Sequence, residues 1–391
     1  MAQPDGPGVG RTFLRLGSTS FGGPVAHLGY FREALVARRG WLGDAQYADL
    51  VALAQFLPGP ASSQVGMGIG LLRGGLSGSL RAWLGFTLPT AVLMIAAGLA
   101  VGTGVAVPGG LVAGLQAAAA AVVAQAVLAM ARSLCRGPLL ALLALVTGLV
   151  ALRWPALWVP IVALLVAGVV GGLALRGEAM PDAEEVLPRP RLPRWAPSAA
   201  VLAFGALLVG LPVAARAWPG EWLVLLAGCY RAGALVFGGG HVVLPLLDEV
   251  AVGSGALDEQ AFLAGYGLAN AMPGPLFAFA GYVGAAAGGV ALGIACLVAI
   301  FLPGWLLVVA TLGAWHRLAA DPRLRGALAA LNAAVVGLLG AALWNPVLTK
   351  GITSWPAALV AAAAFVALVP LRVAPQVVVA ACAVLGLLVL A

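Results

Sequence analysis

Two segments of the same form, Leu57-Pro58-Gly59-Pro60 and Met272-Pro273-Gly274-Pro275, each interrupt an apolar stretch long enough to cross a bilayer. Two more apolar stretches contain Phe21-Gly22-Gly23-Pro24 and Phe237-Gly238-Gly239-Gly240. Proline removes a backbone donor and glycine adds flexibility, so each of these four motifs is predicted to break a helix. Broken backbone at membrane depth must be buried in protein or line a watery cavity. The motifs therefore predict an interior site rather than four ordinary membrane spans.

The composition indicates that these motifs belong to a membrane protein. Of 391 residues, 62% are hydrophobic and only 9% are charged, whereas a soluble globular chain is about 25% charged. This difference excludes a soluble enzyme, a disordered regulator and a coiled coil. The formal net charge of +7 is better explained by basic loops beside a bilayer than by binding to nucleic acid. The expected partners are lipid and a transported solute, with no nucleic acid.

Apolar segments and one polar linker divide the chain into six, one and six candidate membrane segments. The predicted units are an N-terminal transporter half at 1–176, the linker at 177–196, a connecting transmembrane helix at 197–220 and a C-terminal transporter half at 221–391. The apolar segments are 12–31, 46–72, 82–107, 110–131, 138–152, 155–175, 197–217, 221–247, 261–286, 290–315, 326–345, 355–371 and 374–391.

The second half of the sequence repeats the first. The matched positions, at offsets that drift only from 216 to 214, are Arg15 with Arg231, Phe21 with Phe237, Gln55 with Asn270, Pro58 with Pro273 and Pro89 with Pro303. Such a repeat in a membrane chain is typical of a transporter built from two homologous halves.

A count of membrane crossings predicts that the two halves have opposite orientations. Six segments return the chain to its starting side, and the single helix at 197–217 then inverts the second half. With a cytoplasmic N-terminus, most arginines lie on the cytoplasmic side of the cell (inner) membrane, as the positive-inside rule requires. The motif segments either span or re-enter on one side, and re-entry places Arg32, Arg38 and Arg39 inside as well. Both alternatives put the C-terminus outside.

No arrangement of residues in the sequence predicts catalysis or a cofactor. The four cysteines are isolated and the three histidines are far apart, with no metal-ligand spacing. No Gly-x-x-x-x-Gly-Lys-Ser/Thr motif is present, which argues against a nucleotide-driven pump. We therefore expect a protein that is not an enzyme and that uses neither a metal nor an organic cofactor.

Several ordered runs resemble the chromate transporter (CHR) family. Those of the first half are Phe21-Gly22-Gly23-Pro24-x-x-His27, Val36-x-Arg38-Arg39-x-Trp41-Leu42 and Ala52-Leu53-x-Gln55-x-Leu57-Pro58-Gly59-Pro60-x-x-x-Gln64. Those of the second half are Phe237-Gly238-Gly239-Gly240-x-x-x-Leu244-Pro245 and Pro273-Gly274-Pro275. The resemblance is to the long-chain, two-domain members. It implies an all-α polytopic membrane protein with two homologous halves of inverted topology and broken or re-entrant helices, which exports chromate at the expense of the membrane gradient.

Chromate is a tetrahedral dianion, and its transfer into a low-dielectric region needs compensating charge or hydrogen bonds. Helices that restart after Pro60 and Pro275 would offer free N–H groups and a favourable dipole, and arginines would offer a fork of donors. The candidate substrate-binding residues are Arg15, Gly22, Gly23, Pro24, Gln55, Pro58, Gly59, Pro60, Ser62, Ser63, Gln64, Arg231, Gly238, Gly239, Gly240, Asn270, Pro273, Gly274 and Pro275.

The candidates for coupling transport to protons are His27, Asp49 and His241, because histidine titrates near neutral pH and a carboxyl group at membrane depth can carry a proton. Purely structural roles stay open for all these residues: prolines can kink packed helices, polar side chains can cap helices, and arginines can snorkel to the interface.

The sequence favours a secondary active exporter of chromate or a related tetrahedral oxyanion. In this hypothesis one half rocks against the other and exposes a central site alternately to the two sides. A transporter of sulfate or another oxyanion and a passive anion channel are the open alternatives, as is a homodimer in place of a monomer.

Overall fold

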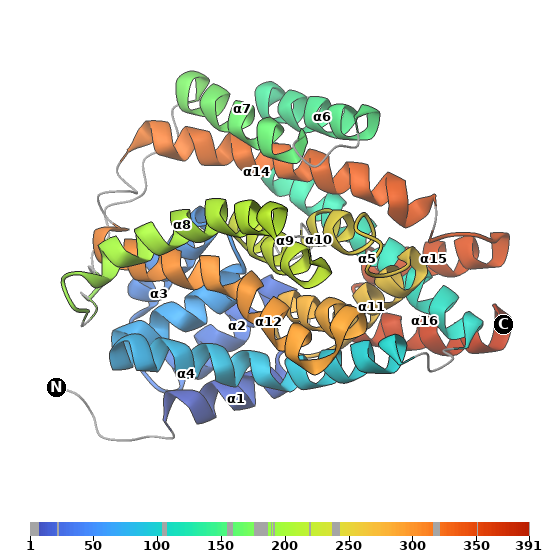
Figure 1. Cartoon of the computed structure of the whole chain (residues 1–391), viewed down its shortest axis with the longest axis horizontal. Coiled ribbons are helices and arrows are strands. Elements are labelled where there is room, and N and C mark those ends of the chain that lie inside the picture. Colours follow the sequence, from blue (N-terminus) through green and yellow to red (C-terminus); the bar gives the residue numbers. More distant parts are fainter. Residues whose placement is uncertain are drawn as a thin grey trace.

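The computed structural model describes residues 8–21, 23–103, 108–154, 159–175, 187–188, 190, 192–218, 220–236, 243–315, 321–349 and 351–390, and the regular structure in these ranges is entirely helical. Figure 1 shows the longer helices running roughly along the long axis of the molecule. Five helical stretches of the described chain are long and apolar enough to cross a membrane. The prediction of an all-α polytopic membrane protein is confirmed.

The helices follow the apolar segments of the sequence closely. The first half contains α1 (Val9–Thr19), α2 (Gly23–Phe31), a π-helical turn (Arg32–Ala37), α3 (Asp44–Phe56), α4 (Ala61–Gly102), α5 (Gly109–Leu134), α6 (Pro138–Arg153) and α7 (Val159–Ala174). The connecting helix is α8 (Ala196–Ala217). The second half contains α9 (Glu221–Leu235), α10 (Val243–Ala251), α11 (Glu259–Ala271), a 3-10 turn (Leu276–Ala278), α12 (Phe279–Thr311), α14 (Pro322–Ala342), a π-helical turn (Leu343–Leu348), α15 (Trp355–Leu368) and α16 (Pro375–Val389).

The helices that end at the four motifs are short. Helix α1 has 11 residues, α3 and α11 have 13 each, and α9 has 15. At about 1.5 Å per residue none of them reaches the roughly 30 Å thickness of a hydrocarbon core. The chain therefore breaks inside the membrane region, as the Gly and Pro motifs predict.

Helices α4 and α12 are each a tight hairpin of two helices. The chain reverses at Gly74-Gly75 in α4 and at Gly288-Gly289 in α12, where the second glycine of each pair has a φ of 62° and 79°. A β-carbon on Gly70 would overlap the carbonyl of Gly78, eight residues further along the chain, so the two limbs touch. The two reversals lie 214 positions apart, so they occur at equivalent positions of the sequence repeat.

The long limbs of these two equivalent hairpins pack against each other in opposite directions. The indole N–H of Trp305 donates to the Ser79 hydroxyl (3.1 Å), and the rings of Trp83 and Phe301 lie 5.8 Å apart. As the residue number rises on α4 it therefore falls on α12. Equivalent helices that run antiparallel are related by a two-fold axis perpendicular to them, so the two halves are inverted, as predicted.

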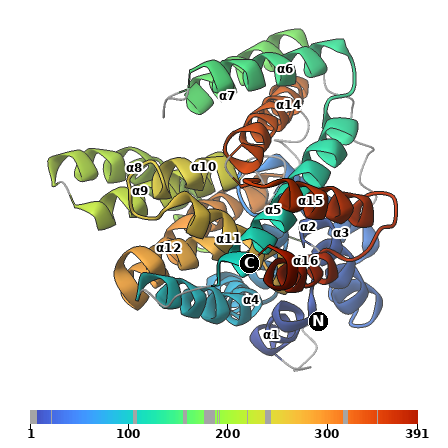
Figure 2. The same cartoon turned by 90° about the vertical axis from the view of Figure 1, so that its right-hand side faces the viewer.

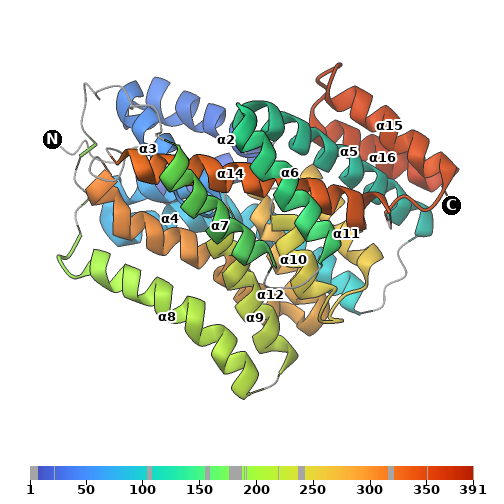
Figure 3. The same cartoon turned by 90° about the horizontal axis from the view of Figure 1, so that it is seen from above.

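The two sequence halves also exchange helices. Helix α14 of the second half packs mainly against α6 and α7 of the first, whereas α5 of the first half packs mainly against α15 and α16 of the second. Figure 2 shows these two groups at different edges of the molecule. The motif helices α1–α4 and α9–α12 form a core beside these two groups, which also contact each other through α5 and α14. Helix α8 lies at the outer edge in Figure 3, with little of its surface buried.

This exchange changes the expected motion. Glycines make the closest approaches between the halves: a β-carbon on Gly337 would overlap the Ala144 carbonyl, and one on Gly114 would overlap the Cys382 carbonyl. Small residues at such crossings are the usual way in which membrane helices pack tightly. Rocking of residues 1–176 against 221–391 as two rigid bodies would break these contacts, so any large motion has to be divided differently.

Glycines at the core crossings should be sensitive to a single methyl group. A β-carbon on Gly17 would overlap the Phe86 carbonyl, and one on the equivalent Gly233 would overlap the Ile300 carbonyl. We expect Gly17→Ala and Gly233→Ala each to destabilise the protein by about 1–3 kcal/mol. The measurement is thermal unfolding in detergent.

The matched control is Gly205→Ala on α8, where a β-carbon meets no atom within 4 Å. That change should leave stability unaltered or raise it slightly, since alanine favours a helix by up to about 1 kcal/mol over glycine. Equal melting temperatures for all three variants would contradict the packing described for the core.

Candidate functional site

The four breaks are joined in pairs across the two halves. The N–H of Gly59 donates to the carbonyl of Val236 (2.7 Å), and the N–H of Gly274 donates to the carbonyl of Ser20 (2.8 Å). Gly59 and Gly274 are equivalent in the repeat, as are Ser20 and Val236. Each Pro-Gly-Pro break is thus hydrogen-bonded to the residue that precedes the Phe-Gly-Gly motif of the other half. We call these two places the junctions.

Each junction is packed on the long helix of the other half. The backbone of Gly59, with φ at 123°, lies against Gly304 on α12, and that of Gly274, with φ at 91°, lies against Thr90 on α4. The Thr90 hydroxyl donates to the carbonyl of Pro273. A side chain at either junction glycine would require a strained backbone and would meet the opposite helix at once.

Helices restart immediately after both Pro-Gly-Pro breaks. Helix α4 begins at Ala61, and a 3-10 turn that leads into α12 begins at Leu276. The first N–H groups of such helices have no partner within the helix, and the dipole makes this end attractive to anions. At the first break, Nε2 of the Gln64 side chain donates to the carbonyl of Pro58 (2.8 Å), which gives this carbonyl a hydrogen-bond partner.

A set of buried polar atoms in the first half has no hydrogen-bond partner among the described residues. An unpaired buried polar atom costs about 1–3 kcal/mol, and native proteins contain few of them. These atoms are Ser20 Oγ, Ser63 Oγ, Gln64 Oε1 and Thr87 Oγ1. They come from the two breaks of the first half and from the segment of α4 beside Pro89, so a ligand or water in this region would supply the missing partners.

His27 lies between the two junctions. Its Nδ1 is 3.2 Å from the Ser62 hydroxyl, in the first turn after the first-half break. Its ring packs edge-on against Phe86, with ring centres 5.3 Å apart, and the carbonyl of Phe86 lies beside Gly274 of the other junction. The imidazole is 1% exposed. The two junctions therefore belong to one continuous region.

The second half offers far fewer polar side chains at the equivalent positions. Phe277, Ala278 and Phe279 stand where the first half has Ser62, Ser63 and Gln64, and the Phe279 ring packs on the aromatic rings of α11. The candidate site is thus built asymmetrically. The first half supplies side-chain polar groups, and the second supplies backbone and apolar walls.

The structure does not bring every candidate to the junctions. Arg15 is exposed and forms no ion pair with another described residue, and Arg231 lies 3.9 Å from the Glu249 carboxylate on α10. Gln55 is exposed, and its counterpart Asn270 donates to the Tyr266 carbonyl of its own helix (2.8 Å).

Other candidates lie at or near the breaks, or outside the described chain. Gly23 and Pro24 begin α2 and are half-buried. Asp49 is buried on α3, and its Oδ2 has no hydrogen-bond partner among the described residues. Five candidates fall outside the described residues: Gly22, Gly238, Gly239, Gly240 and His241.

Four residues at this site escaped the sequence reasoning. Three of them lie beside the glycine and proline positions of the repeat, but a lone hydroxyl in an apolar segment carries no pattern. These three are Ser20, Thr87 and Thr90. Glu249 lies on α10, and nothing in its sequence spacing reveals that it faces Arg231. No group of three or more His, Cys, Asp or Glu side chains in the described part of the chain is arranged to hold a metal ion.

Inverted halves that join their broken helices in the interior define a duplicated membrane transporter scaffold. The sequence profile of the chromate transporter family matches residues 8–173 and, a second time, residues 223–387. The chain therefore belongs to the chromate transporter family, and its two halves are homologous.

Relatives cover most of the chain. The chromate transport protein of Pseudomonas aeruginosa is 31% identical over 335 residues, which is 84% of this chain and 78% of the relative. The chromate transport protein of Cupriavidus metallidurans is 28% identical over 344 residues, or 85% of this chain and 80% of the relative. A probable chromate transport protein of Synechococcus elongatus is 26% identical over 85% of this chain and 82% of its own length. No solved structure matches the chain.

Two neighbouring serines should differ in their effect on stability, because the Ser62 hydroxyl has a partner in the protein and the Ser63 hydroxyl has none among the described residues. Ser62→Ala removes the partner of the buried His27 Nδ1, so it should lower stability by about 1–3 kcal/mol. Ser63→Ala removes a buried hydroxyl that has no described partner, so it should leave stability unchanged or raise it. Thermal unfolding without substrate measures both, and an equal loss in the two variants would contradict this assignment.

Proposed function

We propose that this protein is a secondary active transporter that exports chromate or a related tetrahedral oxyanion by alternating access. The observation that carries the proposal is the pair of cross-half hydrogen bonds at the junctions, together with the unpartnered buried polar atoms beside them. Membership in the chromate transporter family and the chromate transport proteins among the relatives support chromate as the substrate.

The chemistry of the cluster suits a tetrahedral oxyanion. Hydroxyl groups, a histidine ring and the first N–H groups of α4 are all able to donate to oxygen atoms. Ser62 and Ser63 lie in that same first turn, and both are nearly fully buried. In an interior from which water is largely excluded, such donors would replace the hydration shell that the dianion leaves behind.

Arginines supply the positive charge that hydrogen bonds alone do not provide. Arg15 and Arg231 are each five residues ahead of a junction carbonyl, those of Ser20 and Val236. A guanidinium binds an oxyanion through two parallel donors, which gives both charge and orientation. We assign these two arginines to capture of the oxyanion on its way to and from the junctions.

The helix exchange defines which parts move in this proposal. The core of α1–α4 and α9–α12 holds both junctions, and the groups α5–α15–α16 and α6–α7–α14 flank it. Alternating access then arises from motion between the core and these two flanking groups. The inverted repeat relates the two end states of such a motion by an approximate two-fold rotation about an axis in the membrane plane.

A transport assay with purified protein in liposomes tests the function directly. We expect accumulation of chromate against its gradient, with sulfate as a competitor. Arg15→Gln and Arg231→Gln should each lower transport roughly 10- to 150-fold, since each change removes about 1.5–3 kcal/mol of charge-assisted binding. Arg136→Gln in the loop after α5 is the control and should transport normally.

The results also separate the alternatives. Flux that only equilibrates chromate, without counterflow, would identify a passive channel. Flux of sulfate without chromate would change the substrate. Undiminished transport by both arginine variants would remove them from the mechanism.

We further propose that the protein lies in the cell (inner) membrane with Met1 in the cytoplasm and Ala391 outside. The distribution of arginines in the sequence supports this orientation, and the antiparallel packing of α4 and α12 supports the inversion behind it. Tags at the two termini of the full chain should be accessible from opposite sides of intact cells. Two tags on one side would contradict the proposed topology.

A further inference from the structure

An ion pair connects the two limbs of the second-half broken helix. Arg231 is on α9, ahead of the Phe237-Gly238-Gly239-Gly240 motif in the sequence, and Glu249 is on α10, after it. Arg231 Nη2 and Glu249 Oε2 lie 3.9 Å apart, and both side chains are 24% exposed. This separation is longer than a hydrogen bond, so the pair is engaged only by charge.

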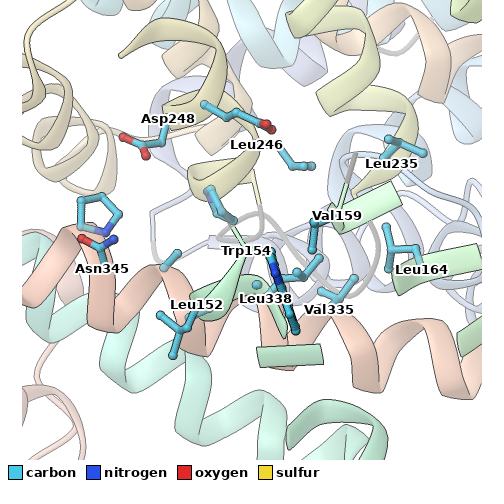
Figure 4. A pocket seen from close by; sticks show the side chains of 16 residues that line it. Leu152, Trp154, Val159, Leu164, Leu235, Leu246, Asp248, Val335, Leu338 and Asn345 are labelled. Carbon is cyan, nitrogen blue, oxygen red and sulfur yellow. The ribbon is translucent and has the colours of Figure 1, made fainter. Parts of the chain in front are cut away.

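Glu249 lines a cavity of about 220 Å³. Figure 4 shows this cavity from close by. The core contributes Leu235, Asp248 and Glu249 to its wall, and the flanking group of α6, α7 and α14 contributes mainly apolar residues from the opposite side, with Asn345 just beyond α14. The Glu249 side of the ion pair therefore faces the boundary between the core and a flanking group. This is where a motion between the two would open or close space.

The first half contains the same two residues in the same places but pairs them differently. Arg15 and Glu33 precede Arg231 and Glu249 by 216 positions each. Arg15 is exposed and has no ion pair among the described residues, while Glu33 forms an exposed pair with Arg38 at 2.8 Å. The ion pair is thus formed in the second half, and its sequence equivalent is not formed in the first half.

We propose that Arg231–Glu249 and Arg15–Glu33 are alternating ion-pair latches, each closing the broken helix of its own half while the other is open. The proposal rests on the transport function proposed above. In the described conformation the second-half latch is engaged, and the transport cycle exchanges the two. Because the halves are inverted, the two latches act on opposite faces of the membrane.

Two physical points support the exchange. The Glu33–Arg38 pair is exposed on both sides, and such pairs contribute little stability, so Glu33 is readily released to Arg15. The carboxylate and the oxyanion also compete for the same guanidinium, because both present two oxygen atoms to its fork of donors. Binding of the oxyanion to Arg231 therefore releases Glu249 and opens that latch.

Cross-linking of cysteine pairs tests the alternation. Two double variants keep all four charged residues and place cysteines about one helical turn from them. They are Leu235→Cys with Leu246→Cys, whose side chains line the cavity beside Glu249, and the repeat-equivalent Thr19→Cys with Tyr30→Cys. Both are reconstituted in liposomes and treated with a short, cleavable thiol-to-thiol reagent. The four native cysteines are free, and the unsubstituted protein gives their background. Arg32→Cys with Asp44→Cys, which replaces an exposed ion pair outside both latches, is the control for yield.

Without chromate we expect the second-half pair to cross-link and the first-half pair to remain near background. Saturating chromate should lower the yield of the second-half pair at least threefold and raise the yield of the first-half pair by a similar factor, with the control unchanged. The proposal is overturned if the first-half pair stays at background in both conditions, if chromate changes neither yield, or if the two yields rise and fall together.

A further variant separates failure of the latch from failure of the transport proposal. Glu249→Gln in the Thr19→Cys, Tyr30→Cys protein removes the engaged latch without any ligand and leaves Arg15 and Glu33 in place, so it should raise the first-half yield at least threefold in the absence of chromate. If the unsubstituted protein moves no chromate but this increase is seen, the proposed substrate is wrong and the latch stands. If chromate is transported and the increase is absent, the latch is wrong.

Discussion

The structure depends on one constraint: a backbone that is broken inside a membrane must find its hydrogen-bond partners within the protein. Here each break finds one in the other half, through Gly59 with Val236 and Gly274 with Ser20. The two bonds are equivalent, because the repeat relates both their donors and their acceptors. Each half therefore supplies a hydrogen-bond acceptor to the break of the other half.

The helices around the two junctions also pack across the two halves. The equivalent hairpins α4 and α12 cross antiparallel, each half contributes a helix to the other's flanking group, and glycines allow the backbones to approach closely. The result is a rigid frame around a region in which polar atoms of the first half are left without partners. A frame of this kind fixes the donors before the substrate arrives, which lowers the cost of ordering them on binding.

The sequence predicts the fold well because its signals are strong and local. Apolar length locates the helices, and the repeated Gly and Pro motifs locate the breaks, since both follow from backbone chemistry alone. The four motifs predict an interior site, but the sequence does not predict which breaks pair or which bonds join them. The exchange of α6, α7, α15 and α16 between halves could not be predicted, because it depends on small residues whose partners are more than a hundred positions away.

The site was predictable in part for the same reason. Ser62, Ser63 and Gln64 follow a visible break and lie at the junction, whereas Thr87 is a single hydroxyl in an apolar helix. Arg15 and Arg231 are equivalent in the sequence, yet one is exposed and the other faces Glu249. An inverted repeat in a single conformation must treat equivalent residues differently, so sequence symmetry cannot reveal which one is engaged.

The central claim is that the two junctions enclose one oxyanion site. The most direct measurement is an experimental structure of the purified protein with chromate, in which the anomalous signal of chromium locates the ion independently of the protein map. The account predicts chromium near the start of α4, with its oxygens in hydrogen-bonding distance of Ser63 or Gln64. Chromium bound away from both junctions, with no ligand near Ser63 or Gln64, would contradict the account.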